Sequence, residues 1–198
     1  MRGFLRSSVT WKAPLGDPRQ GSAEVTIQEL QVRPRDNAQL GETQVDTSEM
    51  TLRNSGPLVL RVDNTAARVV QAKVTALNTD LTASGSYTFH SKSPWNAALN
   101  GAVNMAVLST FRPDLVASGS ASIDASLRGA AADPQLSGKM SISGASFYLK
   151  DLPNGIEKAS GTVYFEKQRA NIEKLTGQTG GGTFDISGFV GYSRDEVS

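Results

Sequence analysis

The chain has 198 residues, and its 20 lysines and arginines nearly balance its 19 aspartates and glutamates, for a formal net charge of +1. This length allows one sizeable domain or part of a repeating array, and the balanced charge argues against a nucleic-acid-binding protein, which needs a basic surface. Cysteine is absent, which excludes disulfide bonds and cysteine-ligated metals.

Alternation of apolar and polar residues dominates the sequence from its first third, and it predicts β-strands with one apolar and one polar face. Val25 and Ile27 belong to the first such run, and Leu58, Leu60 and Val62 to the next. Prolines fall between the runs or at their first residue, where a missing amide donor does least harm to a sheet.

The segment AARVVQAKVTAL at residues 66–77 fits two structures. Ala67, Val70, Val74 and Leu77 have the spacing of a helical face, whereas its valines and alanines also alternate as in a strand. A turn-forming Asn-Thr-Asp follows. We predict a strand here, with a helix as the alternative.

The next run, LTASGSYTFH at residues 81–90, places Leu81, Ala83, Tyr87 and Phe89 on one face and hydroxyl side chains on the other. This alternation predicts a strand. TFDISGFVGY, near the end of the chain, has a similar pattern with the same Ser-Gly in the middle.

The segment after residue 98 is ambiguous. Val103, Met105 and Val107 share a parity with Leu99, which predicts a strand as far as Val107. The sequence NMAVLSTFRPDL at residues 104–115 fits one or two helical turns equally well.

Between Ile142 and Ala145, the inward apolar residues change from even-numbered to odd-numbered positions. Residues 120–127 alternate serine and aspartate with alanine, isoleucine and leucine, and the inward residues Met140 and Ile142 are even-numbered. The inward set that follows, Ala145, Phe147 and Leu149, is odd-numbered. A bulge or bend at Gly144 is predicted to reset the face.

Val163 and Phe165 form another short run, and Phe184 and Ile186 form the last. The glycines of TGGGTF (179–184) are not followed by the Gly-Lys-Ser/Thr of a phosphate-binding loop. A tight turn is therefore predicted there.

Three segments recur in the same order at offsets of about 103 to 117 residues, which indicates a repeated β-rich unit. The predicted modules are residues 1–98 and 99–198. The matched pairs are 15–27 with 131–142, 54–62 with 159–167, and LTASGSYTF with FDISGFVGY.

The sequence gives little support for catalysis. His90 is the one histidine, at the end of a strand pattern on its polar face, where a solvated side chain is expected. No histidine and carboxylate cluster with metal-ligand spacing is present. We expect no enzymatic activity, no metal and no cofactor. The aromatic residues suggest a carbohydrate platform as an alternative to sheet core and cross-strand pairs, which we favour.

Residues 99–192 resemble the repeating core of the TamB and AsmA-like family, and residues 15–98 resemble the preceding copy more loosely. The resemblance lies in an ordered series of elements. These are Phe111-Arg112-Pro113-Asp114-Leu115, Ser118-Gly119, Leu127-Arg128-Gly129, Asp133-Pro134, Leu136-Ser137-Gly138, Phe147, Ile156, Ser160-Gly161, the TVYF run, Ile172, Leu175, Gly180-Gly181-Gly182 and Ser187-Gly188.

The resemblance implies an all-β fold: a long, curled, antiparallel sheet forming an open trough (a β-taco) with an apolar interior and at most short helical turns. It implies a periplasmic segment of a protein anchored in the inner membrane of a diderm bacterium. It further implies phospholipid transport between the membranes, outer-membrane protein assembly, or both. An Omp85-class partner is expected to bind elsewhere in a longer protein, because this chain shows neither the family's membrane helix nor its partner-binding end.

The predicted partners of this segment are phospholipid acyl chains, held by a strip of inward apolar residues. A structural or adhesive protein whose apolar faces pack against each other is the alternative, and an enzyme on a β-solenoid is a third. The predicted lining is Leu81, Ala83, Phe89, Val103, Met105, Val107, Ile123, Leu127, Met140, Ile142, Phe147, Leu149, Val163, Phe165, Phe184 and Ile186.

Overall fold

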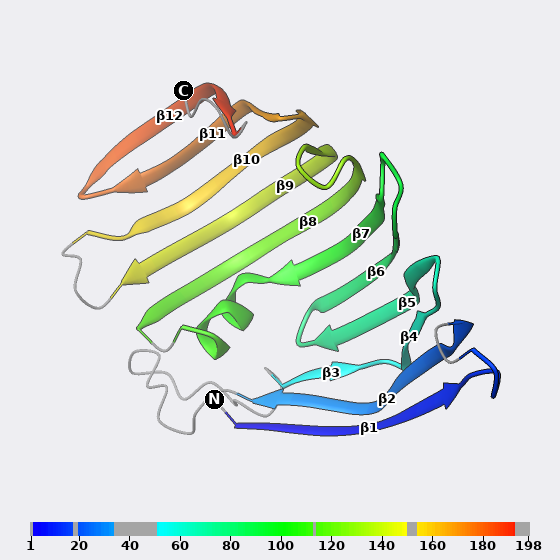
Figure 1. The fold of residues 1–198 in the computed structure, drawn as a ribbon. Helices are drawn as coiled ribbons and strands as arrows, with labels where there is room; N and C mark the ends of the chain where they lie inside the picture. The colour runs from blue at the N-terminus through cyan, green and yellow to red at the C-terminus, as the bar shows by residue number, and fades with distance from the viewer. Residues whose placement is uncertain (1, 18–19, 34–50, 113, 150–153, 193–198) are drawn as a thin grey trace.

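The computed structural model describes residues 2–17, 20–33, 51–112, 114–149 and 154–192, and these residues form one twelve-stranded antiparallel sheet (Figure 1). A 3₁₀ helix, η2 (Met105–Thr110), interrupts the strands. The strands are β1 (Arg2–Lys12), β2 (Ser22–Arg33), β3 (Leu52–Asn54), β4 (Leu58–Val62), β5 (Ala66–Ala76), β6 (Thr79–Thr88), β7 (Trp95–Asn104), β8 (Leu115–Gly129), β9 (Pro134–Leu149), β10 (Ile156–Lys167), β11 (Arg169–Thr179) and β12 (Gly182–Gly191).

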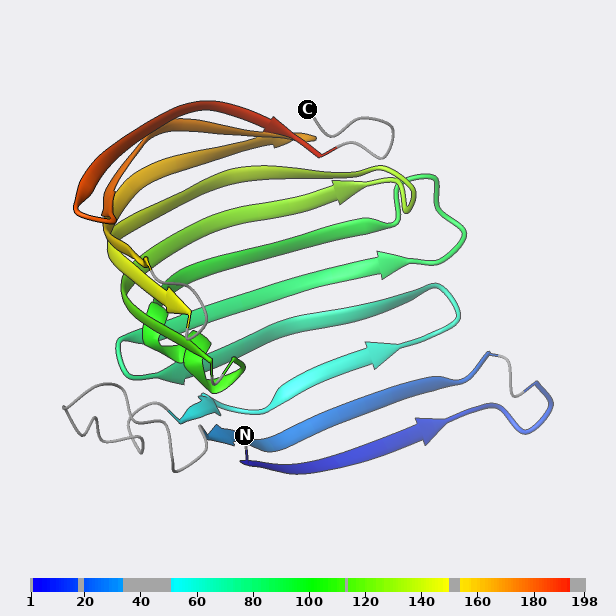
Figure 2. The same cartoon turned by 90° about the vertical axis from the view of Figure 1, so that its left-hand side faces the viewer.

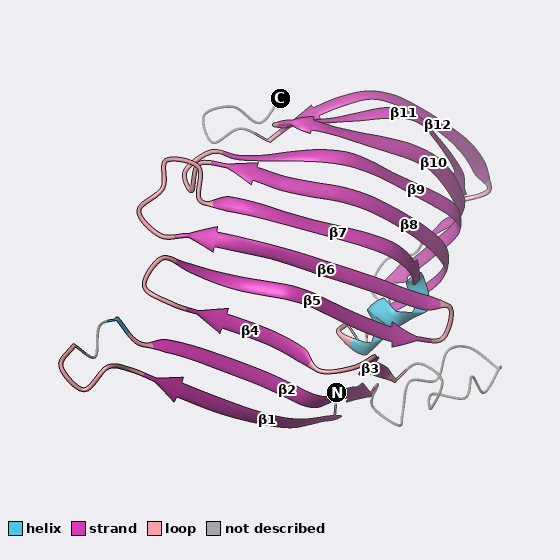
Figure 3. Cartoon of the chain, turned by 90° about the vertical axis from the view of Figure 1, so that its right-hand side faces the viewer, coloured by secondary structure: helices cyan, strands magenta, loops and turns pink. Residues whose placement is uncertain are grey.

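Strand order in the sheet follows chain order (Figure 3). The short strands β3 and β4 together fill one position, between β2 and β5. Every described pairing is antiparallel, so the sheet is a series of hairpins, and the prediction of an all-β antiparallel fold is confirmed. The predicted module boundary at residues 98 and 99 lies within β7, and the module limits stay a prediction.

The sheet curls into a trough, and η2 lies inside the curve (Figures 1 and 2). We call the side that carries η2 the concave face and the opposite side the convex face. Glycines with positive φ lie on the concave side of three strands: Gly101 (φ 142°), Gly138 (φ 138°) and Gly188 (φ 137°). Other residues rarely adopt this conformation, so glycine lets these strands bend sharply.

Strand β8 shows how the sequence divides the two faces. Ala117, Ala121 and Ala125 point to the concave face and are buried, whereas the intervening residues Ser120 and Ser122 are exposed on the convex face. Alternation of this kind requires one apolar and one solvated environment. The predicted one-sided strands are therefore confirmed.

Cross-strand ion pairs mark the convex face. Arg61 Nε lies 2.8 Å from a Glu24 carboxylate oxygen, and Lys174 Nζ lies 3.5 Å from a carboxylate oxygen of Asp185. All four side chains are exposed, so each pair contributes little to stability. Their role is to keep this face polar.

Three local predictions are confirmed. Residues 66–76 form strand β5 and not a helix. The parity change occurs at Gly144, which has a φ of 56° and lies opposite a register shift between Ser118 and Ser120. Gly180 and Gly181, both with positive φ, form the tight turn between β11 and β12.

The predicted strand through Met105 and Val107 is wrong, and the helical alternative for this segment is right. Strand β7 ends at Asn104, whose side-chain oxygen accepts a hydrogen bond from the Ala106 amide at 3.0 Å and so caps η2. Asparagine is a strong helix N-cap, because its side chain satisfies an otherwise free amide. The cap overrides the strand alternation of the valines.

The turn between β4 and β5 depends on Asp63. Its carboxylate accepts hydrogen bonds from the Thr65 hydroxyl, from the Thr65 amide at 2.7 Å, from the Arg68 guanidinium and from the Ala66 amide at 2.8 Å. These bonds favour the ionised form and hold the pKa of Asp63 well below its ordinary value of 3.8.

Because this pKa is lowered by folding, Asp63 stabilises the native state above pH 3.8, and this contribution is lost as the pH falls further. We expect Asp63→Asn to lower the melting temperature slightly at neutral pH. The difference from wild type should shrink below pH 3.8, as measured by circular dichroism. A difference that grows on acidification would contradict this assignment.

Candidate functional site

The central concave face is built from apolar rows that cross neighbouring strands. Cross-strand register places Gly101, Ile123, Met140, Val163 and Ile172 in one row, from β7 to β11. Directly opposed residues in an antiparallel pair lie on the same face and touch. The row is therefore continuous across five strands.

Two parallel rows flank it, and both combine large with small side chains. Because a sheet that bends inward crowds its concave side, alternate small residues make room for large ones. The rows are Leu99, Ala125, Gly138, Phe165 and Ala170, and Val103, Ala121, Ile142, Gly161, Leu175 and Ile186.

Other predicted lining residues also lie on the concave face. Leu81 and Ala83 pair with Gly101 and Leu99 at the β6–β7 junction. The remaining four extend the face toward its two edges, where Leu127 pairs with Leu136, Phe147 with Ala117, Leu149 with Leu115, and Phe184 with Gly177.

Three predicted lining residues lie off the strands. Phe89 follows the last residue of β6, and its ring lies 5.9 Å from the Tyr87 ring at the edge of the trough. Met105 and Val107 lie on η2, with 9% and 4% of their surfaces exposed. The two η2 residues cover part of the concave face instead of forming its floor.

Within the described residues, no second layer of strands or helices packs on the sheet apart from η2. Ten hydrophobic residues are buried among the described part of the chain, and six of these are alanines. Larger concave side chains such as Ile123, Met140 and Phe165 are half-buried. In a sandwich, a facing sheet would bury these side chains fully. Among the described residues, most large side chains of the concave face outside η2 are therefore partly exposed, although Ala125 and Val163 are buried.

Charge is partitioned between the two faces. Asp124 and Arg128 of β8 and Lys139 of β9 all point to the convex side. Among charged residues that have a described cross-strand partner, Lys167 is the one that register places on the concave side, at the end of β10. A surface without charged anchors can contact a hydrocarbon chain at any point along it without desolvating an ion.

The sequence-based list missed several residues of the same surface. Leu99 and Tyr87 follow the same alternation as the residues that were included, and that alternation was sufficient to find them. Ile172 and Leu175 differ in parity because a register shift separates them. No simple alternation reveals both residues at once.

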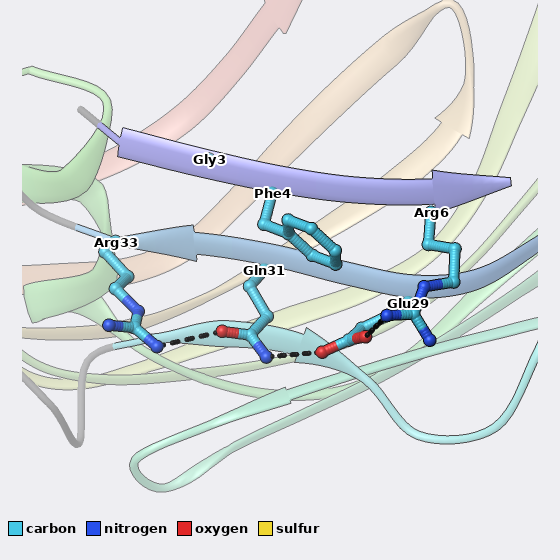
Figure 4. A pocket seen from close by; sticks show the side chains of 6 residues that line it. All are labelled: Gly3, Phe4, Arg6, Glu29, Gln31 and Arg33. Carbon is cyan, nitrogen blue, oxygen red and sulfur yellow. Dashed lines mark hydrogen bonds and ion pairs between the residues drawn. The ribbon is translucent and has the colours of Figure 1, made fainter.

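The convex side of β1 and β2 contrasts with this apolar surface (Figure 4). Gln31 Nε2 donates to Glu29 at 2.8 Å, Arg33 donates to Gln31 at 3.0 Å, and Arg6 lies 3.9 Å from Glu29. The Arg6 guanidinium also lies 5.8 Å from the centre of the Phe4 ring. These side chains satisfy one another and form a solvated polar ladder.

Two searches of the described residues bear on other functions. No group of three or more histidine, aspartate or glutamate side chains there is arranged to hold a metal ion. No helix in the same residues has the length and apolar character to span a membrane.

A family model described as the TamB C-terminal domain matches residues 68–191, which is more than half of the chain. The chain belongs to the TamB family. Searches of curated proteins and of solved structures gave no match. The matched residues run from β5 to β12 and include η2 and all the predicted lining residues.

Membership places the chain among components of the translocation and assembly module. TamB-family proteins are anchored in the membranes of diderm bacteria and work with an Omp85-class partner. Proteins of this family are components of transport and assembly systems, and they are not known as enzymes. The resemblance seen in the sequence is therefore confirmed at the level of the family.

Proposed function

We propose that the concave face of this TamB-family chain carries phospholipid acyl chains between the inner and outer membranes, in a periplasmic segment of an inner-membrane-anchored protein. One observation carries the proposal: a continuous apolar surface that remains half-exposed because no second layer covers it. Soluble proteins rarely expose a large apolar surface unless something binds there.

The energetics require such a surface. At about 0.8 kcal/mol for each methylene, two acyl chains of about 15 carbons cost on the order of 25 kcal/mol to transfer into water. A concave strip of aliphatic and aromatic side chains offsets most of this cost. Because the strip has few polar anchors, its sites have similar affinities, and a lipid can move along it without stalling.

The dimensions also suit a lipid. The sheet path contains eleven strands, and at about 4.8 Å between strands its floor measures about 48 Å. Half of a bilayer's hydrocarbon core is about 15 Å thick. An acyl chain can therefore shift along the floor while staying in contact with apolar side chains.

A role in outer-membrane protein assembly is compatible with the same surface, since an unfolded β-strand also presents alternate apolar side chains. We place contact with the Omp85-class partner outside these strands. The structural or adhesive alternative requires apolar faces packed on each other, and the open concave face does not support it.

Mass spectrometry of organic extracts tests the proposal directly. We expect full-length protein, purified without added lipid, to carry at least one phospholipid per chain. A periplasmic protein of similar size, purified in parallel, serves as the control. Phospholipid at no more than the control level would contradict lipid transport by this surface.

A further inference from the structure

Helix η2 covers one part of the concave face and leaves the rest open. Met105 packs in a cluster with four buried alanines, Ala117, Ala121, Ala145 and Ala159, which we call the alanine seat. Because alanine side chains are short, the seat is deep enough to receive a helix. Beyond the seat, the concave rows combine large side chains with small ones.

The start of η2 is tied to the sheet, and its end is closed by local bonds. At its start, the Asn104 amide donates to the Thr79 hydroxyl at 2.9 Å, and this buried hydroxyl donates to the Leu77 carbonyl at 3.2 Å. Asn104 also caps the helix through the Ala106 amide. These bonds connect η2 to the beginning of β6.

At the other end, the amides of Phe111 and Arg112 both donate to the Leu108 carbonyl, at 3.0 and 3.1 Å. The Arg112 guanidinium then forms two bonds with the Asp114 carboxylate, at 3.0 and 2.7 Å, just before β8. A six-residue 3₁₀ helix is not stable alone, so these ties and the burial of Met105 and Val107 hold it in place.

The position of η2 leaves one side of the trough free. It follows the end of β7 and precedes the start of β8, so it lies at the edge opposite to Trp95 and Gly129. The concave residues on the Trp95 side form an open strip across β7 to β10. The open strip consists of Leu99, Ile123, Leu127, Met140 and Phe165, all half-buried.

We propose that η2 confines acyl chains to the open strip and excludes them from the alanine seat. The inference rests on the proposed function and adds to it the path that an acyl chain takes along the concave face. An acyl chain would have to displace Met105 and Val107 to reach the seat, and it would gain only contacts with alanine in return. The open strip offers larger side chains that are already accessible.

Photo-crosslinking in the full-length protein tests this path. The probe is p-benzoylphenylalanine in place of one aromatic residue at a time, in cells labelled with radioactive phosphate. Phe165 lies in the open strip, Phe147 packs beside the η2 cluster, and Tyr164 points to the convex face and is 37% exposed. The three sites are matched in size, so each tolerates the probe.

We expect phospholipid adducts at Phe165 to exceed those at Phe147 and at Tyr164 by about tenfold. In a Met105→Ala, Val107→Ala double variant, which loosens η2, adducts at Phe147 should rise several-fold while those at Phe165 stay unchanged. Both results support confinement by η2.

Other outcomes separate the two proposals. Equal adducts at Phe165 and Phe147, both above Tyr164, would overturn confinement and leave lipid transport standing. More adducts at Phe147 than at Phe165 would also overturn it. If neither site exceeded Tyr164, the proposed function itself would fail, and the inference with it.

Discussion

Replacing Ile123 with aspartate should block the passage of phospholipid along the concave face while leaving the sheet folded. Ile123 lies in the central concave row, between Gly101 and Met140, and is half-buried. An aspartate at the centre of an apolar lipid environment costs about 3 kcal/mol, which corresponds to about a 100-fold loss in occupancy. The measurement is the transfer of radiolabelled phospholipid between the two membranes in cells that carry the full-length variant.

Ser122→Asp is the matched control. Ser122 is the neighbouring residue on the convex face and is already exposed, so the same new charge remains in water. We expect this variant to transfer lipid as wild type does. Circular dichroism checks that both variants keep their strand content. Normal lipid transfer by a folded Ile123→Asp protein would show that acyl chains do not pass over this row.

Gly138→Ala should destabilise the sheet strongly. Gly138 has a φ of 138°, and a Cβ there would overlap the carbonyl oxygen and the Cα of the strand opposite. The conformational strain costs about 1–3 kcal/mol. The overlap with backbone atoms cannot be relieved by a side-chain rotation, so we expect a total loss above about 4 kcal/mol.

Gly188→Ala separates these two causes. Gly188 has nearly the same φ, 137°, but a Cβ there would meet nothing within 4 Å. This variant should show the strain alone, about 1–3 kcal/mol, in urea unfolding monitored by circular dichroism. Equal losses for the two variants would mean that the close approach of β8 to β9 at Gly138 does not constrain the fold.

The apolar alternation was sufficient to predict most of the fold. Apart from the segment after Asn104, each predicted run became a strand with its apolar side on the concave face, because period-two patterns have one favourable orientation when a single face is solvated. The change of parity at Gly144 was also readable, since glycine and a reversed alternation coincide there. The curl of the sheet came from the family resemblance and not from the pattern.

The apolar alternation did not predict features that depend on local hydrogen bonds or register shifts. Met105 and Val107 continue the alternation of β7, yet the Asn104 cap turns them into a helix. The register shift between Ile172 and Leu175 has no glycine or proline within β11 itself, and Gly188 of β12 lies opposite Ile172. A period-two reading through these two residues therefore assigns one of them to the wrong face.

The candidate site was predictable as a set of side chains but not as a surface. Residues such as Ile123 and Phe165 could be selected by parity alone. Parity carries no information about what covers a face, and a sandwich and a trough have the same alternation. The placement of η2 over the alanine seat depends on three-dimensional packing, so the open strip became visible only in the structure.

The agreement of strand order with chain order has a consequence for how the molecule acquires its shape. Apart from β4, which pairs with β2 and β5, each strand needs only its immediate predecessor as a template, so the chain entropy of loop closure stays small at most steps. Folding can then advance along the chain, one hairpin at a time. A structure assembled in this way can be lengthened by whole hairpins during evolution without disturbing the strands already in place.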